Sequence, residues 1–156
     1  MRLIVFVVIV LLTSGLATPA HAQDDGQWTS INHGGRSMTY GQINLSDSDA
    51  AWIVVFRKRP NHEGELEARR MYLTADCAAG TIERGAFINS VEPGGEVIRS
   101  GTFHGRVSVY GQLSLSLTPI YTWLCEAGGG PYGYGGLEFT YSEVVAHATF
   151  WLNQPN

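Results

Sequence analysis

The chain has 156 residues, of which 44% are hydrophobic and 15% charged, and its formal net charge is −4 at pH 7. This mild acidic balance excludes the basic footprint of proteins that bind DNA, RNA or anionic lipid. The length lies in the usual range of one domain, so we expect a single hydrophobic core and no nucleic-acid partner.

The first 22 residues have the pattern of a secretory signal peptide. Arg2 precedes an uncharged apolar run from Leu3 to Leu12, and the small-residue site Ala20-His21-Ala22 follows. A membrane anchor is the alternative, but a spanning helix needs roughly 20 apolar residues and helix breakers interrupt this segment. We predict cleavage after Ala22 and a mature protein that does not span a membrane and resides in the periplasm or is secreted.

Removal of the leader leaves 134 of the 156 residues and takes away one basic residue, so the net charge becomes −5. The densest basic run extends from Arg57 to Arg59, and Glu63, Glu65 and Glu67 lie just beyond it. Because these carboxylates offset the run, we interpret it as a solvated strand end or hairpin loop.

The chain has two cysteines, Cys77 and Cys125. Cysteines exported to an oxidising compartment are expected to pair, and a metal site would need more ligands than two distant thiols. The pair would enclose a loop of 49 residues. Closing a loop of that length stabilises a domain by roughly 4 kcal/mol. We therefore predict a structural disulfide.

Short β-prone segments separated by turn residues predict several strands. The continuous apolar run Ala51–Phe56 is the expected central strand, and Val107–Leu117 has the clearest alternation of apolar and polar residues. The other expected strands are Trp28–Asn32, Met38–Leu45, Arg70–Cys77, Thr81–Asn89 and Glu96–Arg99.

Residues alternate between the two faces of a strand, which predicts the side of the sheet that carries the disulfide. In the expected strand Arg70–Cys77, the side chains of Met71, Leu73, Ala75 and Cys77 share one face. The disulfide should therefore cross the core side of the sheet and fasten whatever packs there. In Thr81–Asn89, the same rule places Ile82, Ala86 and Ile88 on one side.

Two segments favour helices. Thr118-Pro119 is a helix start, although the β-prone residues 120–123 leave a strand as the alternative. Near the C-terminus, Ser142-Glu143 opens a segment that we expect to form a helix docked on the domain or on a partner, with Leu137–Tyr141 as an optional edge strand before it. The expected contact residues are Leu117, Tyr121, Leu124 and Cys125 in the first helix and Tyr141, Val145, Ala148 and Leu152 in the second.

The span from Trp28 to Cys125 resembles the surface-adhesin protein E-like family of exported bacterial proteins. The resemblance rests on Trp28, on the strand ending Trp52-Ile53-Val54-Val55, on Tyr72 to Cys77, on Ile82-Glu83-Arg84 and on Trp123-Leu124-Cys125. Its most specific part is an Asp-Cys pair at a strand end with a second cysteine far downstream.

The resemblance implies an α+β fold in which a disulfide tethers a C-terminal helix to one face of an antiparallel β-sheet. It also implies an adhesin-like partner, a host or envelope protein. We expect the family domain to cover residues 23–127. A Gly/Tyr-rich linker at 128–136 and a C-terminal extension at 137–156 would follow. Within the linker, Tyr132 and Tyr134 are candidate partner-binding residues because loops often carry function.

Catalytic and metal sites are not indicated. The four mature histidines occur singly, without the short spacing of metal ligands, although the sequence leaves open a spatial cluster of Asp76 with a histidine. We therefore expect no catalytic residue, no metal and no cofactor. The favoured function is an exported, non-catalytic protein-interaction module. The alternatives are a structural or stress-related periplasmic domain and, less favoured, a small hydrolase.

Overall fold

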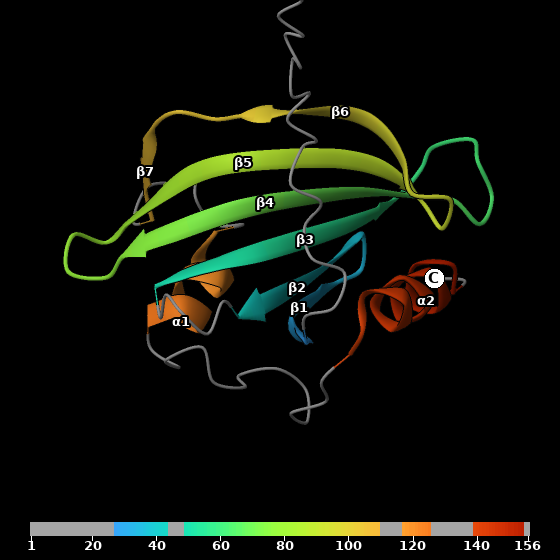
Figure 1. Cartoon of the computed structure of the whole chain (residues 1–156). Coiled ribbons are helices and arrows are strands. Elements are labelled where there is room, and N and C mark those ends of the chain that lie inside the picture. The colour runs from blue at the N-terminus through green and yellow to red at the C-terminus, as the bar shows by residue number, and fades with distance from the viewer. Residues whose placement is uncertain (1–26, 44–48, 110–116, 126–138, 155–156) are drawn as a thin grey trace, which may run out of the picture.

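The computed structural model describes residues 27–43, 49–109, 117–125 and 139–154, which form a seven-stranded antiparallel sheet and two helices (Figure 1). The strands are β1 (Trp28–Gly34), β2 (Ser37–Ile43), β3 (Ala50–Lys58), β4 (Leu66–Asp76), β5 (Thr81–Glu92), β6 (Glu96–Thr102) and β7 (Arg106–Ser108), and the helices are α1 (Thr118–Cys125) and α2 (Tyr141–Leu152).

The strands follow one another across the sheet in chain order from β1 to β6, and β7 pairs with β5 beyond the end of β6 (Figure 1). Each neighbouring pair is antiparallel, which agrees with the few residues that separate consecutive strands in the sequence. The predicted antiparallel sheet is confirmed, and the apolar run Ala51–Phe56 lies in the interior strand β3 as expected.

The two helices cover opposite faces of the sheet. On β3, Val54 and Phe56 pack in the cluster that contains α2, whereas Ala51 and Ile53 pack in the cluster that contains α1. Because alternate residues of a strand point to opposite sides, these clusters define an α1 face and an α2 face. Burial on both faces explains why β3 is apolar throughout rather than alternating.

Helix α1 begins at Thr118, as the Thr-Pro pair predicts, so the strand alternative for this segment is wrong. The carbonyl of Leu117 accepts a hydrogen bond from the amide of Tyr121 at 2.9 Å and so belongs to the first helical turn. The expected strand Val107–Leu117 is therefore wrong at its end. Strand β7 contains residues 106–108, and residues 110–116 lie outside the described ranges.

The disulfide joins Cys77 to Cys125, with Cα atoms 5.5 Å apart, and holds α1 on the sheet. Cys77 is exposed and lies in the turn after β4 rather than in the strand, which corrects its expected position. Its backbone carbonyl accepts a hydrogen bond from the Tyr121 hydroxyl of α1 at 2.8 Å. The predicted face is nevertheless confirmed, since Leu73 and Ala75 pack in the α1 cluster.

A bulge in β5 changes which residues share a face. Met71 pairs with Phe87, but Leu73, two residues further along β4, pairs with Arg84, three residues away on β5. The extra residue reverses the alternation beyond it. Consequently Ile82 faces α1 whereas Ile88, opposite Arg70, faces α2. The expectation that both isoleucines share one side is wrong.

Helix α2 docks on the sheet as one of the predicted options. Its capping box uses Thr140 and Glu143, and its buried residues Val144, Val145 and Ala148 pack on the α2 face. Just before it, Phe139 exchanges two backbone hydrogen bonds with Trp28, at 2.8 and 2.9 Å. Figure 1 shows α1 and α2 toward opposite ends of the strands, so each helix covers a different half of its face.

Candidate functional site

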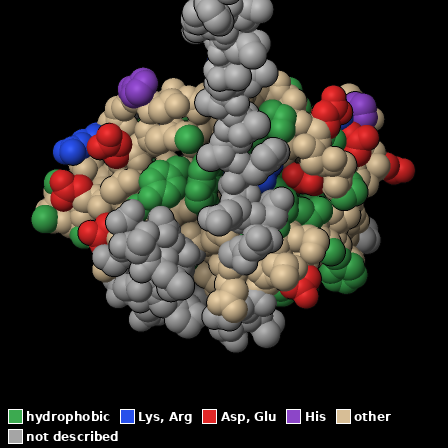
Figure 2. Space-filling view, viewed as in Figure 1, with side chains coloured by type: hydrophobic (Ala, Val, Ile, Leu, Met, Phe, Trp, Pro, Cys, Tyr) green, Lys and Arg blue, Asp and Glu red, His purple; other side chains and the backbone are tan. Residues whose placement is uncertain are grey.

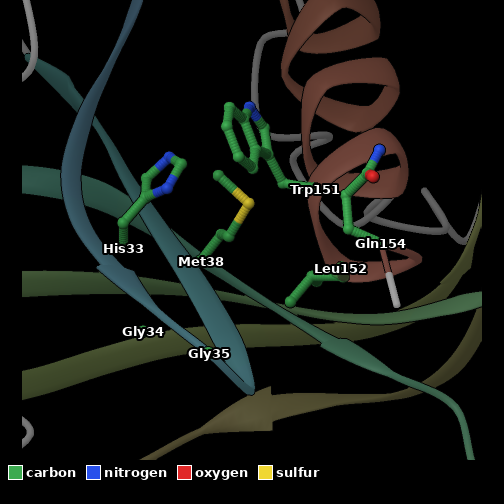
Figure 3. A pocket seen from close by; sticks show the side chains of 7 residues that line it. All are labelled: His33, Gly34, Gly35, Met38, Trp151, Leu152 and Gln154. Carbon is green, nitrogen blue, oxygen red and sulfur yellow. The ribbon is translucent and has the colours of Figure 1, made fainter. Parts of the chain in front are cut away.

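A hollow of about 240 Å³ lies between the β1–β2 hairpin and the end of α2. Figure 3 shows that the side chains of His33, Met38 and Trp151 point toward one another there, with Leu152 and Gln154 at its rim. Trp151 remains 49% exposed, so this aromatic side chain is in contact with both the hollow and the solvent.

Both ring nitrogens of His147, which lies one helical turn before Trp151, form hydrogen bonds. The Trp151 indole donates to His147 Nε2 at 3.0 Å, and the Tyr40 hydroxyl lies 2.6 Å from Nδ1. An indole N–H is only a donor, so Nε2 must accept and the proton of the neutral ring sits on Nδ1, which donates to Tyr40. The Tyr40 hydroxyl in turn donates to Met38 Sδ at 3.8 Å.

His33 completes this aromatic cluster. Its ring centroid lies 5.7 Å from that of His147 and 5.6 Å from that of Trp151. Burial lowers the pKa of both histidines, the charge of His33 lowers that of His147 further, and burial raises the pKa of Tyr40. The cluster is therefore neutral at pH 7 and fastens the end of α2 to β1 and β2.

The His147 cluster predicts a loss of stability in mild acid. A histidine whose pKa is lower in the folded than in the unfolded state contributes stability that is full above its ordinary value of 6.5 and is lost as the pH falls through the folded pKa. Protonated Nε2 would also face the Trp151 donor. We expect the melting temperature to fall between pH 7.5 and pH 5 and to fall less in His147→Gln.

His62→Gln is the matched control, because His62 is half-exposed in the β3–β4 hairpin and lies outside the cluster. Thermal unfolding followed by circular dichroism at several pH values should give the control the same pH dependence as the unmodified protein. A pH dependence that His147→Gln leaves unchanged would assign the effect to other groups.

A second set of polar side chains lies buried where α2 begins. Glu92, only 3% exposed, accepts hydrogen bonds from the hydroxyls of Ser90 at 2.9 Å and Tyr141 at 3.0 Å. The Arg70 guanidinium lies 5.1 Å from the centre of the Tyr141 ring. These contacts compensate for the burial of charged groups and join α2 to β4 and β5.

Ion pairs lie at the two ends of the sheet. Figure 2 shows acidic side chains beside basic ones near β7 and beside a histidine at the β3–β4 hairpin. Near β7, Arg106 contacts Glu83 at 3.2 Å, and in the hairpin Arg59 contacts Glu65 at 2.6 Å. Arg59 therefore lies in a hairpin ion pair, as the interpretation of the basic run expects.

Arg57, in the same basic run, lines a groove of about 480 Å³ on the α1 face, which we call the arginine groove. Arg69 of β4 and Arg84 of β5 also line it, together with apolar side chains, the neutral polar side chains of Asn32, Ser37 and Thr39, and one carboxylate, that of Glu67. In the described part of the chain, no ion pair joins Glu67 to these arginines. The Arg84 Nε atom is buried without a hydrogen-bond partner there.

Strand β6 forms one edge of the sheet and is exposed along its whole length. Val97 and Ile98 are 51% and 57% exposed, which is unusual for large aliphatic side chains in a strand. Ile98 is the extra residue at a register shift between Asn89 and Ser90 of β5. At the opposite edge, Phe139 pairs with β1, so among the described strands β6 has the longer uncovered edge.

The structure confirms some of the site residues predicted from the sequence and does not describe others. The Cys77–Cys125 disulfide is present, whereas Tyr132 and Tyr134 lie outside the described residues. Asp76 accepts a hydrogen bond from the Ala79 amide and lies 4.0 Å from Arg106, so its partners in the described structure do not include a histidine.

The sequence interpretation missed the contact between His33 and His147. These residues are far apart in the chain, and only the docking of α2 on the β1–β2 hairpin brings their rings together. The one local signal was the spacing of His147 and Trp151, which are four residues apart and therefore adjacent on a helix.

Within the described ranges, no group of three or more His, Cys, Asp or Glu side chains is arranged to hold a metal ion. Over the same ranges, no helix has the length and apolar character needed to cross a membrane. Comparison with known proteins finds no matching family model, no matching curated protein and no matching solved structure.

Proposed function

We propose that this chain is an exported, non-catalytic protein-interaction module that binds a host or envelope protein through the outer edge of β6. The observation that carries this proposal is the exposure of all seven residues of β6. A sheet edge can pair with an extended segment of another protein, since its outward backbone groups supply hydrogen bonds and its side chains supply specificity.

The side chains of β6 are suited to such a partner. Val97 and Ile98 place two aliphatic groups on an accessible strand, where solvent contact is unfavourable unless a partner covers them. The Arg99 guanidinium lies 5.8 Å from the centre of the Phe87 ring, so this side chain is held against the sheet rather than blocking the edge. The expected partner therefore offers an extended strand with apolar side chains.

Location in the periplasm or outside the cell is supported by the leader pattern and by the disulfide. The proposed similarity to the surface-adhesin protein E-like family is supported by a sheet that carries a disulfide-tethered helix. A non-catalytic role is supported by the engagement of both ring nitrogens of His147, because a general base needs a nitrogen that is free to take a proton.

Binding can be tested with the oxidised mature protein immobilised and exposed to envelope extract and, separately, to host matrix proteins. We expect one extract to yield a partner that the Val97→Lys/Ile98→Lys variant retains at least about tenfold less well, because two central contacts are lost. Phe150→Lys is the matched control, since Phe150 is 60% exposed but lies on α2.

Circular dichroism would establish that each variant is folded before retention is compared. Equal retention by the β6 variant and the unmodified protein would overturn the use of this edge. Retention of no protein from either extract would overturn the interaction role and favour the structural periplasmic domain. Fractionation that confined the mature protein to the periplasm would overturn adhesion to a host and leave an envelope partner.

A further inference from the structure

We propose that the arginine groove is a binding site for an aliphatic carboxylate, a fatty-acid-like amphiphile with a single negative charge. The arginines would hold the head group, and the apolar side chains beside α1 would hold the chain. This site lies on the α1 face and is separate from the edge of β6, so the inference goes beyond the protein-interaction role.

The groove exists because α1 is too short to cover its face. A helix of eight residues is about 12 Å long, whereas a strand of nine residues spans about 30 Å. Among the described residues, helix α1 packs on Ala51 and Ile53 and does not extend along the sheet to Arg57 at the other end of β3. Val55, which is partly buried against the α1 cluster, and Arg57 both line the groove.

The register of the sheet places the positive charges together. Arg57 lies opposite Glu67 on β4, and Arg69, two residues further along β4, lies opposite Val55. Arg57 and Arg69 are therefore diagonal neighbours on one face, close enough for both guanidinium groups to reach one ligand. Arg84 lies opposite Leu73 and reaches the groove from β5.

The partners of these arginines leave room for an anion. The Arg69 Nε–H donates to Asn89 Oδ1 at 3.3 Å, a neutral acceptor, and the Arg84 guanidinium lies 5.3 Å from the centre of the Phe103 ring. Three guanidinium groups face one carboxylate, that of Glu67, so the groove is positive in a protein that is acidic overall. A guanidinium binds a carboxylate through two parallel hydrogen bonds.

The apolar side chains of the groove favour a ligand whose head group is attached to an aliphatic chain. Val55 and Met71 of the sheet, and Leu117 and Ile120 at the start of α1, are among the apolar side chains that line the groove. A volume of about 480 Å³ is within the range of small-molecule sites. Glu67 beside Arg57 would repel a doubly charged head, which favours a carboxylate over a phosphate monoester.

The experiment uses decanoate as the probe and the methionine methyl groups as reporters. The chain has three methionines, of which Met1 is in the leader; Met71 lies in the groove and Met38 is buried on the α2 face. In protein labelled with ¹³C at the methionine methyls, we expect decanoate to shift the Met71 resonance in a saturable way and to leave that of Met38 in place.

Two charge-removing variants make the test specific. Arg69→Gln is expected to weaken decanoate binding by about tenfold or more, because a hydrogen-bonded charge is lost. Lys58→Gln removes the same charge from the residue next to Arg57, on the opposite face of β3, and should leave the affinity within about twofold. Hexanoate should bind more than about tenfold less tightly than decanoate, because it buries fewer methylenes.

Several results would overturn the site. These are an unshifted Met71 resonance, equal binding of decanoate and decanol, a tighter binding of decyl phosphate than of decanoate, and an unchanged affinity in Arg69→Gln. The Val97→Lys/Ile98→Lys variant should still bind decanoate, so a failure of this site and a failure of the β6 interaction can be told apart.

Discussion

Replacement of both cysteines, as Cys77→Ala/Cys125→Ala, is expected to lower the free energy of unfolding by about 2–4 kcal/mol. The disulfide closes a loop with a sequence separation of 48 residues, which restricts the unfolded chain. Small domains have a total stability of about 5–15 kcal/mol, so this loss is a large fraction of it. Urea unfolding of the oxidised protein and of the double variant measures the difference.

The folded state also depends on the disulfide through α1. A helix of eight residues is marginal in isolation, so its structure relies on packing. The disulfide and the bond from Tyr121 to the Cys77 carbonyl both hold it against the sheet. We therefore expect the near-ultraviolet circular dichroism of Trp123 to weaken in the double variant before the sheet unfolds.

The control is the unmodified protein treated with a thiol reductant, which should have the same urea midpoint as the double variant. The urea midpoint of the double variant itself should not change when the reductant is added. Mass spectrometry after alkylation should detect no free thiol in natively exported protein. Detection of two free thiols in that material would contradict both the structural role of the pair and the oxidising location.

Gly41→Ala is expected to destabilise the protein by about 3 kcal/mol, because the added methyl group overpacks the core. A Cβ atom on Gly41 would lie 2.5 Å from Cη2 and 2.7 Å from Cζ3 of Trp123. Trp123 is 1% exposed and cannot move aside. The nearby Ile31 Cδ1, at 2.8 Å, is the end of a flexible side chain and can adjust.

Gly35→Ala is the matched control, since nothing lies within 4 Å of an added Cβ there, and its effect should stay within about 0.5 kcal/mol. Trp123→Phe removes the outer ring atoms and should make Gly41→Ala less costly, with a coupling energy of about 1–2 kcal/mol in a double-mutant cycle. Additive effects of the two substitutions would show that Gly41 and Trp123 do not share a contact.

Local patterns in the sequence were sufficient for much of the fold. The apolar run of β3, the Thr118-Pro119 helix start and the spacing of the C-terminal helix all depend on neighbouring residues, and each element is present. The disulfide could also be predicted, because two cysteines in a chain that begins with a leader pattern are expected to pair with each other.

Local patterns could not settle the relations between elements. The bulge in β5 separates Ile82 from Ile88 because it arises in the pairing of β4 with β5, which a single strand does not encode. The strand expected up to Leu117 does not include Leu117, since that residue's carbonyl accepts the first hydrogen bond of α1.

The candidate sites depend on how distant segments pack together, which local patterns could not settle. The sequence by itself determined most of the strands, the C-terminal helix and the covalent link, since these follow from propensity, periodicity and cysteine pairing. Only the tertiary structure decided that α1 and α2 cover opposite faces, that His33 meets His147, and that Arg57 and Arg69 share a groove while Lys58 points away. The physical reason is that periodicity assigns side chains to faces within one strand, whereas register and helix docking come from contacts between distant segments.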